Sequence, residues 1–369
     1  MTTGFYWDER SFWHGGGNYA GMLPVGGLVQ PMATGGLPES PESKRRLMNL
    51  MNVTGLSGEL ALSGAPEATR DDLLRVHHPA SYLDQFKTVS DAGGGELGRR
   101  TPFGQGGYEL AALSAGLSVA ALQAVLHGDV RNSYALSRPP GHHCLPDFPN
   151  GFCLMANLGI AIQSVRAKGL VERIAVLDWD VHHGNGTEAI FYDDPNVLTI
   201  SIHQDRNYPM DTGDFADRGT GAGAGVNLNI PLPPGVGHVG YMAAMDQIVA
   251  PQIQAFRPDV IIIACGYDAA AIDPLGRMLA TADTFRQMTH RVMDLADELC
   301  NGRLMMSHEG GYSEVYVPFC GHHVLAEMAG SNIDAPDPFA DVFPLRQPSA
   351  AFDRFIQEQL DEMRAALQF

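Results

Sequence analysis

The sequence predicts an α/β fold: a single domain with a central, mostly parallel sheet that is flanked by helices. Short aliphatic or β-branched runs alternate with stretches of helical periodicity, which is the pattern of a parallel sheet covered on both faces. The run DVIIIA at 259–264 is almost entirely apolar, as expected of a central strand. No internal repeat and no convincing linker divides the chain, so one domain spanning residues 1–369 is expected.

These patterns place the main elements along the chain. The strands are expected at 133–137, 173–177, 197–202, 259–264 and 303–306. The helices are expected at 108–126, 240–255 and 281–299, followed by a terminal helix from residue 350. Long loops rich in Gly, Asp or Pro are expected at 14–37, 92–107 and 204–225, and loops of this length are usually functional.

Each expected strand runs directly into polar or glycine-rich sequence. The sequels, in chain order, are RPPGHH, DWDVHHGNG, HQDRNYP, CGYDA and SHEGGY. Ligands of parallel α/β sheets bind just beyond the carboxyl ends of the strands, so these His, Asp, Asn and Tyr side chains would meet at one edge. Turn chemistry alone does not account for five such loops, and we therefore expect an active site there.

The composition predicts a soluble, cytoplasmic protein. The net charge of −18 disfavours binding to nucleic acids or anionic membranes and favours basic substrates. The five cysteines are scattered without a CxxC pair, which predicts a reducing compartment. The N-terminal MTTGFYWDERSFWHGGG does not resemble a signal peptide, and no apolar stretch approaches the roughly 18 residues of a membrane span.

The segment Asp178-Trp-Asp-Val-His182 has metal-binding side chains at every second position. In an extended chain these side chains point to the same side, so Asp180 and His182 can share one cation while Asp178 lies one step behind. A third ligand must come from elsewhere, and Asp268, just past the strand ending at residue 264, is the best placed. Two carboxylates, one imidazole and open positions suit a catalytic divalent ion. The spacing alone also occurs in surface turns, and the neighbouring motifs favour the metal site.

Two further motifs supply groups for proton transfer and charge stabilisation. His142 and His143 follow Arg-Pro-Pro-Gly, a stiff turn that would hold the imidazoles in place for acid–base chemistry. Tyr312 follows two glycines, whose backbone freedom would let the phenol move and hydrogen-bond a developing oxyanion. Taken alone, each of these residues also fits a structural role: a lone histidine is often structural, and a tyrosine after a Gly-Gly turn often packs in the core.

Together these motifs resemble the arginase–deacetylase superfamily, and within it the histone deacetylases and their bacterial class II-like amidohydrolase relatives. The resemblance implies an arginase/deacetylase-like fold with about eight strands and long active-site loops, and an activity that removes acetyl or other acyl groups from amines. The motifs occur in the family's order and span about half of the chain. They are RPPGHH (138–143), GFC (151–153), DWDVHHGNGT (178–187), GYDA (266–269) and EGGY (309–312).

The resemblance also implies roles for individual residues. Zinc, or alternatively iron, would be held by Asp180, His182 and Asp268. The two histidines would manage the attacking water and the leaving amine, the tyrosine would donate to the oxyanion, and one Asp and one Asn would orient the two imidazoles. In chain order these catalytic residues are His142, His143, Asp178, Asn185 and Tyr312. His143 is favoured as general base and later acid, since one group can serve both steps.

Two kinds of binding site are implied in addition. The walls of a narrow acyl-lysine tunnel would be formed by Gly151, Phe152, Tyr208 and Leu275. A first structural potassium ion would lie at Asp178, Asp180, His182, Ser201 and Ile202. A second potassium ion would lie at Phe191, Asp194 and Val197.

Three comparisons with the family's pattern refine this assignment. Asn185 stands where one branch of the family has Asp, and it would orient His143 without adding charge. Tyr312 is present, whereas some class II members lack it and deacetylate poorly. The loop at 92–107 offers only Glu96 as a carboxylate to hold a substrate backbone, followed by Arg99 and Arg100, which would shape a different rim.

Several alternatives stay open. An acetylpolyamine amidohydrolase would take a small cationic substrate, which an acidic surface suits. A manganese ureohydrolase would need additional ligands for a second metal, and the EGGY tyrosine is foreign to that branch. A non-catalytic acyl-lysine binder should have lost one of the catalytic groups, and none is lost. The choice between peptide and small-molecule substrates is left open, as is a homo-oligomer in which the N-terminal loop shapes a neighbour's entrance.

Overall fold

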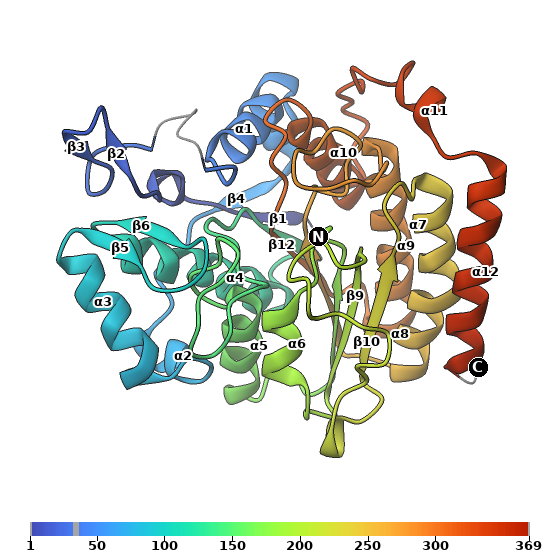
Figure 1. The fold of residues 1–369 in the computed structure, drawn as a ribbon, viewed down its shortest axis with the longest axis horizontal. Helices are drawn as coiled ribbons and strands as arrows, with labels where there is room; N and C mark the ends of the chain where they lie inside the picture. Colours follow the sequence, from blue (N-terminus) through green and yellow to red (C-terminus); the bar gives the residue numbers. More distant parts are fainter. Residues whose placement is uncertain (1, 32–36, 368–369) are drawn as a thin grey trace.

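The computed structural model of the protein describes residues 2–31 and 37–367, and its centre is an eight-stranded, fully parallel sheet (Figure 1). The strand order is β10-β9-β8-β11-β12-β7-β1-β4. The predicted fold class is therefore confirmed. The strands are β1 (Thr3–Tyr6), β4 (Ala61–Ser63), β7 (Asn132–Ala135), β8 (Ile174–Asp178), β9 (Val197–Gln204), β10 (Asn227–Leu232), β11 (Val260–Cys265) and β12 (Leu304–His308).

The five strands expected from the sequence form the middle of this sheet, and the three missed strands lie toward its two edges. β1 and β4 are four and three residues long, too short to show a period in the sequence. β10 reads NLNIPL, and its two asparagines and its proline disfavour a strand assignment. Pro231 is tolerated because β10 is an edge strand, where one side needs no backbone donor.

Helices cover both faces of the sheet and create two hydrophobic cores. Alternate residues of β11 divide between the cores: Ile261 and Ile263 belong to one, Val260 and Ile262 to the other, as the two-residue period of a strand requires. The first core is covered by α1 (Glu42–Thr54), α7 (His238–Ala244), α8 (Ala250–Phe256), α9 (Ala282–Cys300), α10 (Val317–Ala329) and α12 (Ala350–Ala366). The second is covered by α2 (Arg70–Leu74), α3 (Asp84–Asp91), α4 (Gly107–His127), α5 (Asn157–Ala167) and α6 (Asn185–Phe191).

The expected helix at 240–255 is interrupted in a defined way. A π-helical turn at Met245–Val249 joins α7 to α8. Pro251 follows within α8, and it removes a backbone donor that a continuous α-helix would need. The helices at 108–126 and 281–299 are α4 and α9, and Thr281 is the N-cap of α9.

One described helix, α4, is long and apolar enough to cross a membrane by length and composition. Most of its apolar stretch is buried inside the protein. Its neighbours include α5 and the strands β1 and β7. Core packing therefore accounts for its apolar character.

The three expected loops contain little regular structure. The loop at 14–37 includes a small hairpin, β2 (Asn18–Tyr19) with β3 (Leu23–Pro24), and its residues 32–36 lie outside the described residues. The loop at 92–107 is built on a second hairpin, β5 (Gly94–Glu96) with β6 (Pro102–Gly104). The loop at 204–225 contains only the 3-10 turn Gly221–Gly223.

A buried ion cluster ties the N-terminal segment to the loop that follows β7. The carboxylate of Glu39 lies 2.9 Å from the Arg138 guanidinium and 3.1 Å from the Lys44 ammonium, and all three side chains are buried. Arg138 also donates hydrogen bonds to the carbonyl oxygens of Ser11 and His14. A buried charge of this kind is tolerated only when it is paired. The cluster thus fixes the start of the RPPGHH segment.

Glu39→Gln should lower the free energy of unfolding by about 3–5 kcal/mol, because two buried cations lose their counter-charge. Burial would raise the pKa of Glu39, but Arg138 and Lys44 outweigh burial and lower it to about 2. Since that value is below the unfolded one of about 4.5, the stabilisation is fully present above pH 4.5 and is lost as the pH falls toward 2.

Urea unfolding at neutral pH and in steps below pH 4.5 measures both effects. The exposed Glu59→Gln is the control and should change the stability by less than about 0.5 kcal/mol. The ion-cluster assignment would be contradicted if Glu39→Gln lowered the free energy of unfolding as little as the control does. It would also be contradicted if the difference between Glu39→Gln and the wild type did not become smaller in acid.

Candidate active site

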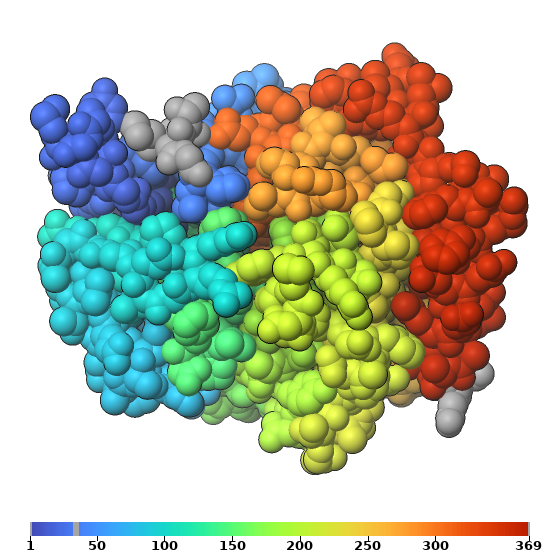
Figure 2. Space-filling view, viewed as in Figure 1, coloured from blue at the N-terminus to red at the C-terminus, as the bar shows by residue number. Residues whose placement is uncertain are grey.

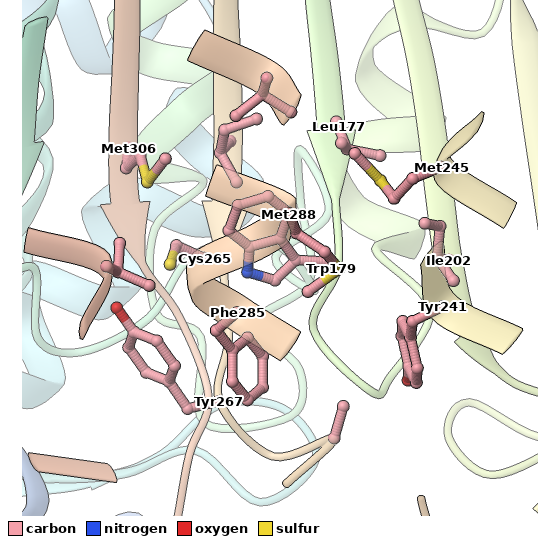
Figure 3. Close-up of a cluster of buried hydrophobic side chains, with 14 of the residues drawn as sticks. Leu177, Trp179, Ile202, Tyr241, Met245, Cys265, Tyr267, Phe285, Met288 and Met306 are labelled. Atoms are coloured by element: carbon pink, nitrogen blue, oxygen red, sulfur yellow. The ribbon is translucent and has the colours of Figure 1, made fainter. Parts of the chain in front are cut away.

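Loops from neighbouring strands meet at the carboxyl edge of the sheet, as predicted. β8, β11, β12 and β7 lie side by side in that order, so the residues that follow them are delivered to one place. Trp179 is fully buried in the first core, beside Cys265 and Phe285 (Figure 3), and Val181 is fully buried in the same core. Their packing anchors the segment that carries the expected metal ligands.

The chain does not stay extended after β8, and the conformation expected through His182 is wrong. The strand ends at Asp178, and the next residues bend away from the sheet. The backbone N–H of Asp180 donates to Asp178 Oδ1 over 3.0 Å, and that of His182 donates to Asp180 Oδ1 over 2.9 Å. Aspartate side chains that accept from the backbone two residues ahead turn the chain in this way. The turn still directs Asp180 and His182 to the same point.

The three expected metal ligands are brought together and buried. One donor atom from each of Asp180, His182 and Asp268 lies within 4.8 Å of the other two. The His182 Nδ1 atom is 3.0 Å from Asp180 Oδ1 and 3.1 Å from Asp268 Oδ2. Backbone N–H groups of Gly310 and Val181 hold the two carboxylates in place, each over 2.7 Å.

The charges of this cluster fit a divalent cation. Two buried carboxylates beside a neutral imidazole carry a charge of −2, which burial makes costly without a counter-charge. Burial and the neighbouring Asp180 raise the pKa of Asp268 to about 7. Burial would lower the pKa of His182, but Asp268 and Asp180 outweigh it and raise that pKa to about 10. These groups hold protons strongly unless a cation replaces them, and their nitrogen and oxygen donors suit a divalent metal ion.

Close packing explains why glycine stands at position 310. A Cβ atom on Gly310 would lie 2.1 Å from Asp268 Oδ2 and 2.6 Å from Asp180 Oδ2. From the sequence, the two glycines before Tyr312 were expected to give the backbone conformational freedom. The structure adds that the first glycine leaves room for both carboxylates.

The paired histidines have different partners. His142 Nδ1 lies 2.9 Å from Asp178 Oδ2, and His143 Nδ1 lies 2.8 Å from Asn185 Oδ1. The ring centroids are 4.0 Å apart. Asp178 and Asn185 are therefore placed where the expected orienting roles need them.

The electrostatics of the two imidazoles also differ. Burial would lower the pKa of His142, but the carboxylates of Asp180 and Asp178 outweigh burial and raise it to about 10. Burial lowers the pKa of His143 well below its usual value, and the charges of His142 and His182 lower it further. One member of the pair therefore favours the charged form and the other the neutral form, which leaves the neutral ring of His143 able to accept a proton.

Tyr312 is held by a residue that sequence reasoning missed. Asp273 Oδ2 accepts the backbone N–H of Tyr312 over 2.7 Å, and Asp273 Oδ1 accepts that of Leu275 over 2.8 Å. Burial raises the pKa of Tyr312 well above its usual value, and the negative charges of Asp268 and Asp180 raise it further. The phenol therefore stays protonated and can act as a hydrogen-bond donor. The only sign of this role in the sequence is that Asp273 follows soon after the GYDA motif.

A second missed residue, Glu309, fixes the turn that carries the histidines. Its Oε2 atom accepts the backbone N–H groups of Gly141 and His142, over 2.7 and 3.1 Å. The carboxyl is buried, and Oε1 has no hydrogen-bond partner among the described residues. Glu309 also lies near His142 and Cys153 in a second group of metal-binding types, but one of its two oxygens is already bound by the backbone.

All four expected tunnel residues line one pocket with a volume of about 840 Å³, together with His143, His182 and Tyr312. The Phe152 and Tyr312 rings are 5.7 Å apart, and Tyr208 lies 5.1 Å from His143. Residues of the hairpin loop and of the 204–225 loop complete the mouth. The expected tunnel residues are Gly151, Phe152, Tyr208 and Leu275, and the others are Arg99, Arg100, Asn207, Met210 and Asp211.

Glu96, the carboxylate considered for holding a substrate backbone, does not line this pocket. Its Oε1 atom accepts the backbone N–H of Thr101 over 2.9 Å, within its own hairpin. Arg99 and Arg100 occupy the rim in its place. No carboxylate of the described β5–β6 hairpin is thus available to hold a peptide backbone.

The residues expected to bind potassium lie around the two ends of β9. Ser201 pairs with Asp178 in the β8–β9 register, and Ile202 follows it. Phe191 ends α6 and Val197 begins β9, while the carboxylate of Asp194 between them pairs with Arg166. The second set, Phe191, Asp194 and Val197, therefore has only backbone carbonyl oxygens free to bind a potassium ion. Potassium binding stays a prediction for both sets.

Comparisons with known proteins place this arrangement among deacetylases. A family model described as Histone deacetylase domain matches residues 37–328. The chain is 54% identical over 363 residues to the histone deacetylase-like amidohydrolase of Pseudomonas aeruginosa, covering 98% of this chain and 95% of that protein. It is 39% identical over 304 residues to a probable deacetylase of Archaeoglobus fulgidus, covering 81% and 84% of the two chains.

Among solved structures, the chain is similar to the crystal structure of the HDA15 HD domain. The TM-score is 0.83 at 30% sequence identity, and the match covers 100% of this chain and 99% of that chain.

Gly310→Ala should weaken the binding of a divalent metal about 10- to 100-fold, the usual effect of disturbing groups around metal ligands, because the new methyl group displaces both carboxylates. Gly58→Ala is the matched control, since a Cβ atom there meets nothing within 4 Å. Metal titration followed by calorimetry measures the difference. Unchanged metal affinity in Gly310→Ala would refute the close-packing argument.

Proposed function

The chain belongs to the histone deacetylase family, and from this premise we propose that it is a zinc-dependent amidohydrolase that removes acetyl or other acyl groups from acylated amines such as acetyl-lysine. One observation carries the proposal. The buried cluster of Asp180, His182 and Asp268 lies beside the paired imidazoles, and Tyr312 lines the same pocket.

Asp180, His182 and Asp268 would hold the zinc ion, with iron as the alternative. When bound, the ion supplies a Lewis acid for the amide carbonyl and lowers the pKa of water. The family as a whole depends on a metal, and the described donor set supports zinc on chemical grounds.

His143 acts as the general base in this proposal. Its Nδ1 atom donates to Asn185 Oδ1, so in the neutral ring Nε2 is the proton acceptor. Nε2 takes a proton from the attacking water and later gives it to the leaving amine. His142 is charged, is oriented by Asp178 and faces Asp180 across 3.8 Å, so it supplies fixed positive charge. Tyr312 donates from its phenol to the oxyanion.

The alternative substrates and roles differ in how well they fit. An acylated polyamine would bring positive charge to a pocket mouth that carries two arginines, so this alternative is less well supported. A non-catalytic binder is disfavoured because each expected catalytic group lies within reach of its partner. Structural potassium is proposed at the two sets of residues around β9, on the resemblance alone.

The wider setting is also a proposal. The five cysteines are buried and unpaired, which suits a reducing cytoplasm. The net charge of −18 supports small acylated amines or peptides as partners and not nucleic acid or membrane. Homo-oligomer formation remains part of the proposal without a specific contact to support it.

The proposal is tested with purified protein and a fluorogenic acetyl-lysine substrate. We expect turnover that is abolished by a chelator and restored by zinc, since the buried carboxylates need the cation. Parallel assays with longer acyl and trifluoroacetyl amides cover other acyl preferences. Turnover that resists the chelator, or no turnover with any acyl group, would overturn the proposal.

Tyr312→Phe should lower kcat about 10²- to 10³-fold, the usual cost of removing one oxyanion donor. The metal content should stay unchanged, since the phenol has no described contact with the ligands' donor atoms. Tyr19→Phe, on the exposed β2–β3 hairpin, is the control and should keep full activity. Wild-type kcat in the Tyr312 variant would show that the phenol is not the donor.

A further inference from the structure

We propose that the mouth of the pocket recognises the charged head of a free α-amino acid, so that the preferred substrate is free Nε-acyl-lysine. This inference rests on the proposed amidohydrolase function and narrows its substrate class. It depends on three charged side chains at the mouth that the proposed mechanism does not use: Arg99, Arg100 and Asp211.

These three side chains have no ion-pair partner within 4.0 Å among the described residues. All three residues are exposed. The two arginines stand next to each other in a chain with 42 acidic against 24 basic residues. They also have not paired with Asp211, although all three line one pocket. Both signs of charge are therefore available to a ligand.

The two arginines stand on a backbone that is fixed to the pocket wall. The carbonyl oxygens of Arg99 and Arg100 accept the N–H groups of Gly151 and Phe152, over 3.0 and 3.1 Å. The N–H of Arg99 donates to the carbonyl of Pro149 over 3.2 Å. Arg100 has a φ of +60°, an unusual conformation for a residue with a side chain, and such conformations are concentrated at functional sites.

The ring of Tyr208 lies close both to Arg100 and to the histidines at the floor of the pocket. The Arg100 guanidinium carbon is 5.5 Å from the centre of the Tyr208 ring. The same ring is 5.1 Å from His143 and 6.2 Å from His182. Its hydroxyl donates to Asn150 Oδ1 over 2.5 Å, so the ring is held in place.

The reach of a lysine side chain matches this arrangement. With the scissile amide at His182 and His143, the four-carbon stem places the Cα atom about 6 Å further out toward the mouth. The α-carboxylate would meet the two guanidinium groups, which bind carboxylates through paired hydrogen bonds. The α-ammonium would meet Asp211, which belongs to the 204–225 loop. Figure 2 shows the hairpin region in teal and this loop in yellow-green side by side on the face in view.

Other substrates leave this set of charges unsatisfied. In a peptide the α-amine and the α-carboxyl are neutral amides, which use neither the arginines nor Asp211. A polyamine carries only positive charge and is repelled by two arginines. A peptide with acidic neighbours would pair with the arginines but would be repelled by Asp211. Among these substrates, only the free amino acid matches both signs with its own α-carboxylate and α-ammonium.

The test compares kcat/KM for four substrates that share the same acetylated amine. They are free Nε-acetyl-lysine, its α-amide, its Nα-formyl derivative and N-acetyl-1,5-diaminopentane, which lacks the carboxylate. Losing one charged contact should cost about tenfold. We expect the free amino acid to exceed each of the other three by about tenfold or more, and to exceed an acetyl-lysine peptide flanked by glutamates.

Variants then assign the preference to the rim. In Arg99→Gln/Arg100→Gln, the ratio of kcat/KM for the free amino acid to that for the α-amide should fall at least about tenfold. Arg206→Gln is the matched control and should keep the wild-type ratio. Arg206 is exposed, has a φ of +49° like that of Arg100, and does not line the pocket.

Each remaining outcome has one meaning. Equal or lower kcat/KM for the free amino acid in the wild type would overturn this inference, as would a preference for the glutamate-flanked peptide or the diamine. An unchanged ratio in the double variant would overturn the assignment to the arginines. In all these cases an acetylated amine is still hydrolysed, so the proposed function stands. It fails when none of the acylated amines is hydrolysed, or when their hydrolysis resists a chelator.

Discussion

The constraint on which the rest of the structure depends is the burial of two carboxylates and an imidazole at the edge of a parallel sheet. Asp180 and Asp268 carry charge where water cannot reach them, and such charge is stable only with fixed partners and a cation. The sheet provides those partners from different strands. The loop after β12 donates an N–H to Asp180, and the segment after β8 donates one to Asp268.

The same constraint shapes the surroundings of the cluster. Three polypeptide segments must approach within hydrogen-bonding distance, which leaves no room for a side chain at position 310. The turn that carries the histidines must be equally fixed, and Glu309 binds two of its N–H groups. At its start Arg138 is held in the buried ion cluster with Glu39. Charge burial thus determines backbone positions well beyond the ligands themselves.

The residues that carry chemistry could be predicted from the sequence because they cluster in short motifs at strand ends. Asp180, His182 and the two imidazoles were identified in this way, and the structure brings them together. The strand β4 at one edge of the sheet and its neighbour β1 could not be predicted, since they are short and their pairing comes from the sheet. Asp273 and Glu309 act through oxygen atoms that bind distant N–H groups, a contact that no local pattern records. The pairing of Arg99 and Arg100 with the 149–152 segment is equally non-local.

The floor and the mouth of the pocket therefore differ in how firmly their side chains are held. At the floor, strands and buried hydrogen bonds hold each group, so a change there disturbs the chemistry for every substrate. At the mouth, two exposed loops present charges that make no ion pairs of their own within the described chain. Such charges cost little in stability, so they can vary without loss of the catalytic centre. We therefore infer that the groups buried at the edge of the sheet determine the reaction, and that the exposed loops determine the choice of substrate.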